Sequence, residues 1–186
     1  MGEVSYPRSD DDSAPPPAGA FEVGGTLFLP RIGAEKILAY EGWSFTAVEY
    51  QKREPVAVAA LRVEFDGVRA SFLEDLAQSH RDELVAAGFT ETQIEMVARG
   101  RCPTGFQVHH VIPLDDGGTN DFLNLILIRN QSEHTAITAY QNQIIRNLAP
   151  GESRRVDFPT PPRGTRIHPQ PVTSLPIERK LYRRKS

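Results

Sequence analysis

The chain has 186 residues, of which 39% are hydrophobic and 24% are charged, and its formal net charge is −3. A single cysteine, Cys102, excludes an internal disulfide and a cysteine-based zinc finger. No apolar run reaches the roughly 18 residues of a membrane span, and the acidic N-terminus lacks the order of a secretory signal. We therefore expect no membrane association, and a protein that stays in the cytoplasm or leaves by a signal-independent route.

The 15 prolines divide the chain into three parts. Residues 1–30 hold five of them and residues 150–186 hold seven, which leaves three between. Because proline removes a backbone donor and fixes φ, such density disfavours packed helix or sheet. We predict a disordered leader over residues 1–20 and an extended tail over residues 150–186. The roughly 120 residues between them suffice for one compact domain.

Charge is distributed unevenly over these parts. The tail carries nine basic residues against three acidic ones, whereas the first 30 residues carry one against five. A basic tail can supply the non-specific attraction for phosphate that an acidic body lacks. A solvated basic terminus explains the same pattern equally well.

The first predicted elements are strands. Residues 21–29, 45–50 and 56–65 are rich in β-branched and aromatic residues with partial alternation. Asp66-Gly67 is typical of a hairpin turn. Residues 21–87 are therefore predicted to be a β-rich N-terminal part that ends in a helix.

Two capping boxes predict two helices in succession. Ser71 to Glu74 would begin a helix that stops at Gly88, and Thr90 to Gln93 would begin a short one that stops at Gly100. We interpret this pair as scaffold, with a helical hairpin that touches nucleic acid as the alternative.

The candidate functional residues lie in the next stretch of about 45 residues, which contains three of the five histidines. Residues 106–112 read as a strand with two adjacent histidines, broken by Pro113, and residues 124–129 read as a returning strand. A helix with apolar positions at helical spacing follows over about residues 131–147, with His134 in its first turn. Neighbouring strand residues point to opposite faces, so one histidine can bind a divalent metal together with His134 while the other stays free as a base. We assign no function to His80 or His168.

This stretch resembles the HNH nucleases, also called His-Me finger or ββα-metal nucleases. The resemblance covers about residues 88–147 and is closest to the HNH domains of secreted antibacterial toxins of the colicin, type VI and Rhs kinds. It rests on the following residues in order: His109-His110-Val111-Ile112-Pro113, Asp116-Gly117-Gly118, Asn124-Leu125 and His134. It implies an α+β fold, with a ββα-metal nuclease domain over residues 88–149 joined to the β-rich N-terminal part and the extended termini.

The resemblance also implies roles for individual residues. His109 and His134 would bind the metal, His110 would be the general base, and Asn124 would orient the catalytic loop. These roles suit hydrolysis, because a base must take a proton from water while a cation polarises the phosphate.

Two basic residues outside the motif, Arg129 and Arg146, are candidates for contact with nucleic acid, although a solvated helix face explains them equally well.

One position departs from the colicin-type pattern. Where those nucleases have a further histidine, this chain has Thr138. Two histidines completed by water or phosphate suit Mg²⁺ or Mn²⁺ better than Zn²⁺. Asp115, Asp116 and Asn120 could reach the site, but we favour a tight turn over 116–118 and a capping role for Asn120.

The sequence thus predicts a metal-dependent endonuclease that cuts DNA with low sequence specificity, with RNA left open. The resemblance adds an antibacterial toxin that acts in a target cell, with a cognate immunity protein and a secretion-machinery or adaptor partner. Two alternatives stay open. One is a non-catalytic finger that binds metal or nucleic acid, and the other is a phage or defence HNH enzyme.

Overall fold

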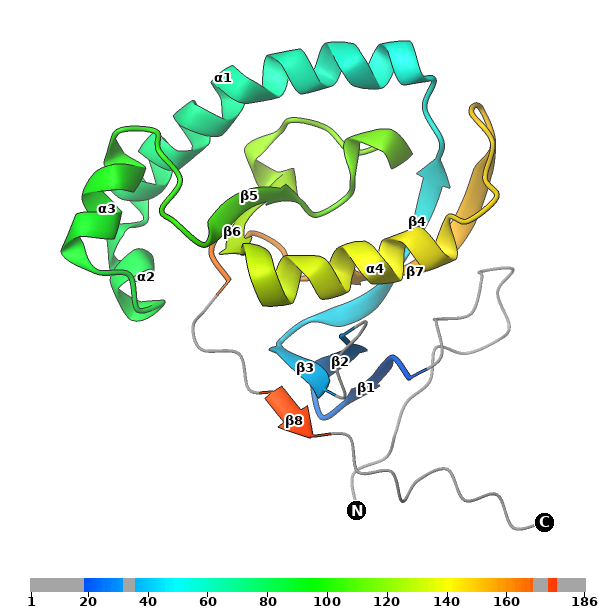
Figure 1. Cartoon of the computed structure of the whole chain (residues 1–186), viewed down its shortest axis with the longest axis horizontal. Coiled ribbons are helices and arrows are strands. Elements are labelled where there is room, and N and C mark those ends of the chain that lie inside the picture. Colours follow the sequence, from blue (N-terminus) through cyan, green and yellow to red (C-terminus); the bar gives the residue numbers. More distant parts are fainter. Residues whose placement is uncertain (1–18, 32–35, 169–173, 177–186) are drawn as a thin grey trace.

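A computed structural model of the chain describes residues 19–31, 36–168 and 174–176. Within these residues helices combine with small antiparallel sheets, which confirms the α+β prediction (Figure 1). The predicted leader falls almost entirely outside the described residues, as does most of the chain beyond His168. No helix in the described part has both the length and the hydrophobicity to cross a membrane.

The largest sheet has the strand order β1-β2-β3-β8, and all neighbours are antiparallel. The predicted single strand over 21–29 is in fact a hairpin of β1 and β2, because Gly24 and Gly25 adopt φ of 57° and 72°. Positive φ at both central residues is the geometry of a tight two-residue hairpin. The bounds of the strands are β1 Phe21–Val23, β2 Thr26–Pro30, β3 Lys36–Glu41 and β8 Ser174–Pro176.

A second sheet joins the N-terminal part to the chain after Pro150. Strand β4 (Ser44–Gln51) pairs along its whole length with β7 (Ser153–Thr160). The segment that we expected to be extended is therefore a strand, held by the buried side chains of Val156 and Phe158. Both lie in the core that also packs against helix α4 (Thr135–Ile144).

The prediction of a strand over residues 56–65 is wrong. These residues begin the long helix α1 (Pro55–Ser79), and Asp66-Gly67 lies inside it rather than in a hairpin turn. Proline is favoured in the first helical turn, and the Ala, Leu, Arg and Glu that follow are good helix formers. Val58 is the only buried residue in this half of α1, so a strand-like apolar run here is an exposed helix surface.

Of the two capping boxes, the second is confirmed. In helix α3 (Glu91–Ala98) the Thr90 hydroxyl accepts from the backbone N–H of Gln93, and the Gln93 side chain accepts from the backbone of Thr90. The first does not begin a helix, because Ser71 to Glu74 lie in the middle of α1. A separate short helix, α2 (Arg81–Ala86), follows α1.

The predicted strand, loop, strand and helix are present. Strand β5 (Phe106–His110) pairs with β6 (Leu125–Arg129), and α4 (Thr135–Ile144) follows a π-helical turn, η3 (Asn130–His134). Both β5 and α4 are shorter than expected. In Figure 1 the β5–β6 hairpin and its loop lie between α1 and α4.

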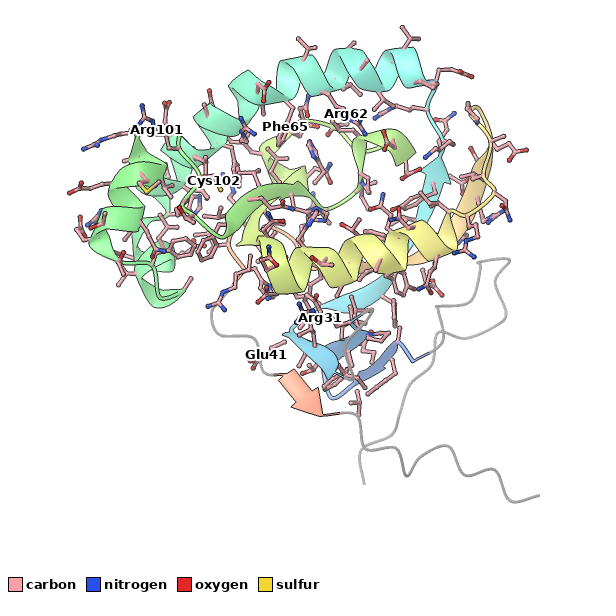
Figure 2. All side chains as sticks on the ribbon, in the orientation of Figure 1. Arg31, Glu41, Arg62, Phe65, Arg101 and Cys102 are labelled. Carbon is pink, nitrogen blue, oxygen red and sulfur yellow. The ribbon has the colours of Figure 1, made fainter. Side chains whose placement is uncertain are left out.

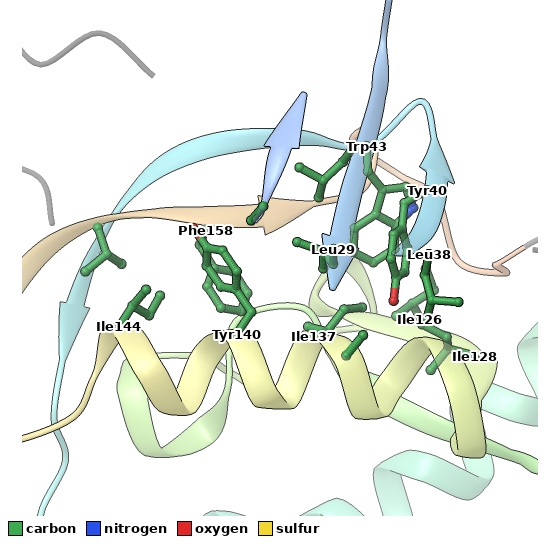
Figure 3. Close-up of a cluster of buried hydrophobic side chains, with 14 of the residues drawn as sticks. Leu29, Leu38, Tyr40, Trp43, Ile126, Ile128, Ile137, Tyr140, Ile144 and Phe158 are labelled. Atoms are coloured by element: carbon green, nitrogen blue, oxygen red, sulfur yellow. The ribbon is translucent and has the colours of Figure 1, made fainter. Parts of the chain in front are cut away.

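Strand β6 separates two hydrophobic cores. Ile126 and Ile128 belong to the core beneath α4, whereas Leu125 and Leu127 belong to the core beneath α1 and α3. This is the alternation of a strand that is buried on both faces. Figure 3 shows Ile137, Tyr140 and Ile144 of α4 directed toward the first of these cores. The Tyr140 hydroxyl also donates to the backbone carbonyl of Asp157, which fixes α4 against β7.

Candidate functional site

The two adjacent histidines lie at the end of β5 and face different neighbours. His109 is buried, with 7% of its surface exposed, and its ring lies 4.9 Å from that of His134, centroid to centroid. His110 is half-buried and lies against Phe65 of α1. The structure therefore brings His109 together with His134, whereas His110 faces helix α1.

His109 and His134 fit a metal ion. The Nε2 atom of His109 has no hydrogen-bond partner among the described residues, although it is fully buried. Burial, together with the neighbouring His134 and His110, lowers the pKa of His109 to about 3, and burial also lowers the pKa of His134. Both rings are thus neutral near pH 7, which is the form that coordinates metals. A buried nitrogen without a partner costs about 1–3 kcal/mol, and coordination would remove that cost.

The described residues supply no third strong ligand to this pair. Nowhere in the described part do three His, Cys, Asp or Glu side chains form a group that could hold a metal. Thr138 lies one helical turn beyond His134, and its hydroxyl is 3.1 Å from the Nε2 of His134. Asp115 lines the same cavity as His109, His110 and His134, but it pairs with Arg62 at 3.0 Å. A cation held by two imidazoles would take its remaining ligands from water and substrate oxygens, as Mg²⁺ and Mn²⁺ do.

His110 is held from two sides. Its Nε2 lies 3.0 Å from Oδ1 of Asn120, and its ring centroid lies 4.3 Å from that of Phe65. Burial lowers the pKa of His110, and the hydrogen bond with Asn120 partly opposes that effect. Asn120 is therefore a neighbour of His110 and not the cap that we expected.

Asn124 holds the loop that follows β5. Its Oδ1 accepts from the backbone N–H of Ile112, and its Nδ2 donates to the carbonyls of Ile112 and Thr119, each at 2.8 Å. These bonds take the place of a strand ladder, which explains why β5 ends at His110 and not at Ile112. The contacts are those expected of a residue that orients a loop, the role predicted for Asn124.

The tight turn predicted over residues 116–118 is present. Gly117 adopts φ of 94°, and a Cβ atom on Gly118 would overlap the carbonyl oxygen of Ile112. Asp116 is fully buried and is not among the residues that line the cavity with the histidines; it accepts from Gln141 at 3.0 Å and from Lys52 at 3.5 Å. Burial raises the pKa of Asp116, and these two donors oppose the rise. Asp116 thus attaches the loop to α4 and to the end of β4.

Three residues that the sequence did not indicate come from the junction of β4 and α1 and from the first half of α1. At the junction, the Arg53 guanidinium donates to the backbone carbonyls of Leu114, Gly117 and Gly118, and so holds the loop. Arg62 and Phe65 lie on the side of α1 that faces the loop (Figure 2). No spacing in the sequence indicated them, because this segment read as a strand.

The histidines share one cavity of about 460 Å³. Its walls come from α1, β5, the loop and α4, with the following lining residues: Arg62, Phe65, Gln107, Val108, His109, His110, Pro113, Leu114, Asp115, His134, Thr138, Gln141 and Asn142. Arg129 and Arg146 are not among them. Arg129 lies opposite Phe106 in the register of β5 and β6, at the far end of the hairpin from His110. Arg146 is exposed beyond the end of α4.

Comparison with known proteins gives a family match over part of this site. Residues 97–131 match the HNH endonuclease family, a family of phosphodiester hydrolases, and the matched segment includes His109, His110 and Asn124 but ends before His134. The chain is also similar to the uncharacterized protein YhhZ of Escherichia coli strain K12, with 35% identity over 130 residues. That match covers 69% of this chain and 32% of YhhZ, so the chain spans about a third of this relative. No solved structure matches the chain significantly.

Proposed function

We propose that this chain is a metal-dependent endonuclease that hydrolyses phosphodiester bonds, with His110 as general base and His109 and His134 as metal ligands. One observation carries the proposal. The buried, unpartnered Nε2 of His109 lies beside His134, while His110 opens onto the same cavity with a different set of contacts. A structural metal finger would need the first arrangement but not the second.

The reaction divides between these residues. His110 takes a proton from a water molecule as the water oxygen bonds to phosphorus, and the bond from phosphorus to the leaving oxygen breaks. Asn124 and Arg53 hold the loop so that His110 faces the same space as His109 and His134. A bound divalent cation would supply Lewis-acid polarisation of the phosphate and stabilise the leaving oxygen.

Arg62 supports nucleic acid as the substrate. Its side chain is 64% exposed, it borders the cavity, and it also lines the neighbouring pocket with Lys52 and Arg53. Cations beside a hydrolytic centre position the phosphate backbone without reading its sequence. This supports cleavage with low sequence specificity. DNA is the proposed substrate, with RNA as the comparison. Arg129 and Arg146 lie outside the cavity, so any contact they make with nucleic acid would be remote from the cut.

The biological role that we propose is that of an antibacterial toxin. Its support is the resemblance of residues 88–147 to the HNH domains of secreted toxins, and its implied partners are an immunity protein and a secretion-machinery or adaptor protein. Expression in a bacterial host should then be toxic, and a neighbouring gene product should relieve the toxicity. Toxicity that no neighbour relieves would favour a phage or defence enzyme.

Plasmid cleavage tests the nuclease proposal. Purified protein should relax and linearise supercoiled DNA with Mg²⁺ or Mn²⁺, and EDTA should stop it. For replacement of His110, which should abolish cleavage, His80→Gln is the control, because His80 contacts Glu83 and does not line the cavity. Loss of cleavage in this control would point to a general effect of histidine replacement. A folded, metal-bound protein that cuts neither DNA nor RNA would instead support a non-catalytic finger.

A further inference from the structure

Asn120 connects His110 to helix α1. Its Nδ2 donates to the backbone carbonyl of Leu61 at 3.0 Å, and its Oδ1 lies 3.0 Å from Nε2 of His110. The side chain thus bridges a fixed point in the helix and the ring of the proposed base.

The Leu61 carbonyl decides which way round the Asn120 amide lies. A carbonyl oxygen only accepts hydrogen bonds, so the amide nitrogen must face Leu61 and the amide oxygen must face His110. Reversing the amide would place two oxygens against each other. An amide oxygen is also only an acceptor, so the Nε2 of His110 must carry the proton and donate it.

We propose that Asn120 is a positioning residue that fixes His110 as its Nε2–H tautomer and leaves the Nδ1 lone pair free to accept the proton of the attacking water. This inference rests on the proposed function, in which His110 is the base. It assigns the reacting atom, Nδ1, and the residue that selects it.

The same bridge suits the charge that the reaction creates. When Nδ1 takes the water proton, the imidazole becomes an imidazolium with both nitrogens protonated. The Nε2–H then donates to Asn120 from a charged group, and such hydrogen bonds are stronger than neutral ones. The contact therefore favours the protonated product of proton transfer over the neutral starting state.

Helix α1 contributes to the positioning of His110, although it lies outside the residues that match the HNH family. Leu61 orients the amide, and Phe65, one turn further along, packs against the His110 ring. Together they restrict both the position and the rotation of the base. Pre-organisation of this kind by residues behind a reacting group changes rates by about 10- to 100-fold in metal sites.

Nitrogen-15 NMR of the histidine rings tests the assignment directly. At mildly alkaline pH, without metal, His110 of the full chain should show a single fixed Nε2–H tautomer. Asn120→Asp retains an oxygen that can accept from Nε2–H but loses the donor to the Leu61 carbonyl, so it should keep this tautomer without the anchor to α1. Asn120→Leu removes the acceptor and should give a mixture of tautomers. Gln143→Leu, which also replaces an amide, lies on the exposed side of α4 and should leave the His110 signals unchanged.

Kinetics supply the second readout. Asn120→Leu should lower kcat by about 10- to 100-fold, with KM and Mn²⁺ affinity unchanged, and Asn120→Asp should recover part of the loss. A purely structural role would instead change the melting temperature and KM together.

The outcomes separate the two proposals. If wild-type His110 carries its proton on Nδ1, or exchanges freely between tautomers, the Asn120 assignment is overturned whether or not the protein cuts DNA. If the tautomer is fixed as described but the protein cuts no nucleic acid, the proposed function fails and not the geometry of the bridge. Should Asn120→Leu not fold, the wild-type tautomer and Asn120→Asp still decide the question.

Discussion

Replacement of Asn124 by alanine should damage both stability and activity, because one side chain makes three backbone hydrogen bonds. Two of them join Asn124 to Ile112 and the third joins it to Thr119. A hydrogen bond contributes about 0.5–1.5 kcal/mol net, and these are only partly buried, so the lower part of that range applies. The expected loss is about 2 kcal/mol of unfolding free energy, or roughly 4–8 °C in melting temperature for a domain of this size.

The single tryptophan provides the stability assay for Asn124→Ala. Trp43 is 2% exposed and packs in the core beneath α4, so its fluorescence reports global unfolding in urea. Cleavage should fall by about 100-fold, since the loop that follows the base loses its anchor.

Thr119→Ala is the control for Asn124→Ala. It removes the Thr119 hydroxyl contact with Asp121 but keeps the backbone carbonyl to which Asn124 donates. Wild-type stability and cleavage in Asn124→Ala would refute the conclusion that this side chain holds the loop.

Three further changes have distinct expected outcomes. Gly118→Ala should abolish cleavage, because the added Cβ would overlap the Ile112 carbonyl oxygen. Gly67 lies within α1, where an added Cβ meets no other atom, so Gly67→Ala should stabilise the protein by about 0.5–1 kcal/mol. Equal effects of the two substitutions in urea melts would refute this contrast. Arg53→Lys should reduce cleavage about 10-fold with KM retained, because the compact ammonium of lysine does not reproduce the planar fork with which the guanidinium reaches three loop carbonyls. A wild-type kcat would contradict this role of Arg53 in holding the loop. Burial and nearby Arg129 lower the pKa of His168 from 6.5 to about 4. Between these two pH values His168 is protonated in the unfolded state but neutral in the folded state. The unfolding free energy should therefore fall by about 3 kcal/mol from this residue as the pH drops from 6.5 to 4. His168→Phe should flatten this part of a pH series of urea melts, and an unchanged slope would show that His168 does not titrate on unfolding.

The ββα segment could be predicted from the sequence because its signals are local. The paired histidines, Pro113, the glycines of the turn and the apolar spacing after His134 each act within a few residues of their own position. The outcome agrees with them: β5, β6 and α4 form in order, Gly117 has positive φ, and His109 lies beside His134.

The contacts across the cavity could not be predicted in this way. Residues 56–65 are an apolar run without a clear period, and such a run does not distinguish a strand from an exposed helix. Once this segment was taken as a strand, nothing placed Arg62 or Phe65 beside His110. Asn120 was expected to cap a turn, because asparagine side chains often form hydrogen bonds with nearby backbone groups. Its amide nitrogen instead donates to the backbone carbonyl of Leu61, 59 residues away. At Asn120, tertiary geometry overrides local preference.

One paired measurement separates the roles of the two adjacent histidines. Mn²⁺ affinity and plasmid cleavage should be measured together for His109→Ala and His110→Ala. We expect His109→Ala to lose both metal binding and cleavage, and His110→Ala to bind Mn²⁺ as wild type does while cleavage falls at least 100-fold. Full cleavage by His110→Ala would contradict its role as the general base, and undiminished Mn²⁺ affinity in His109→Ala would contradict its role as a metal ligand.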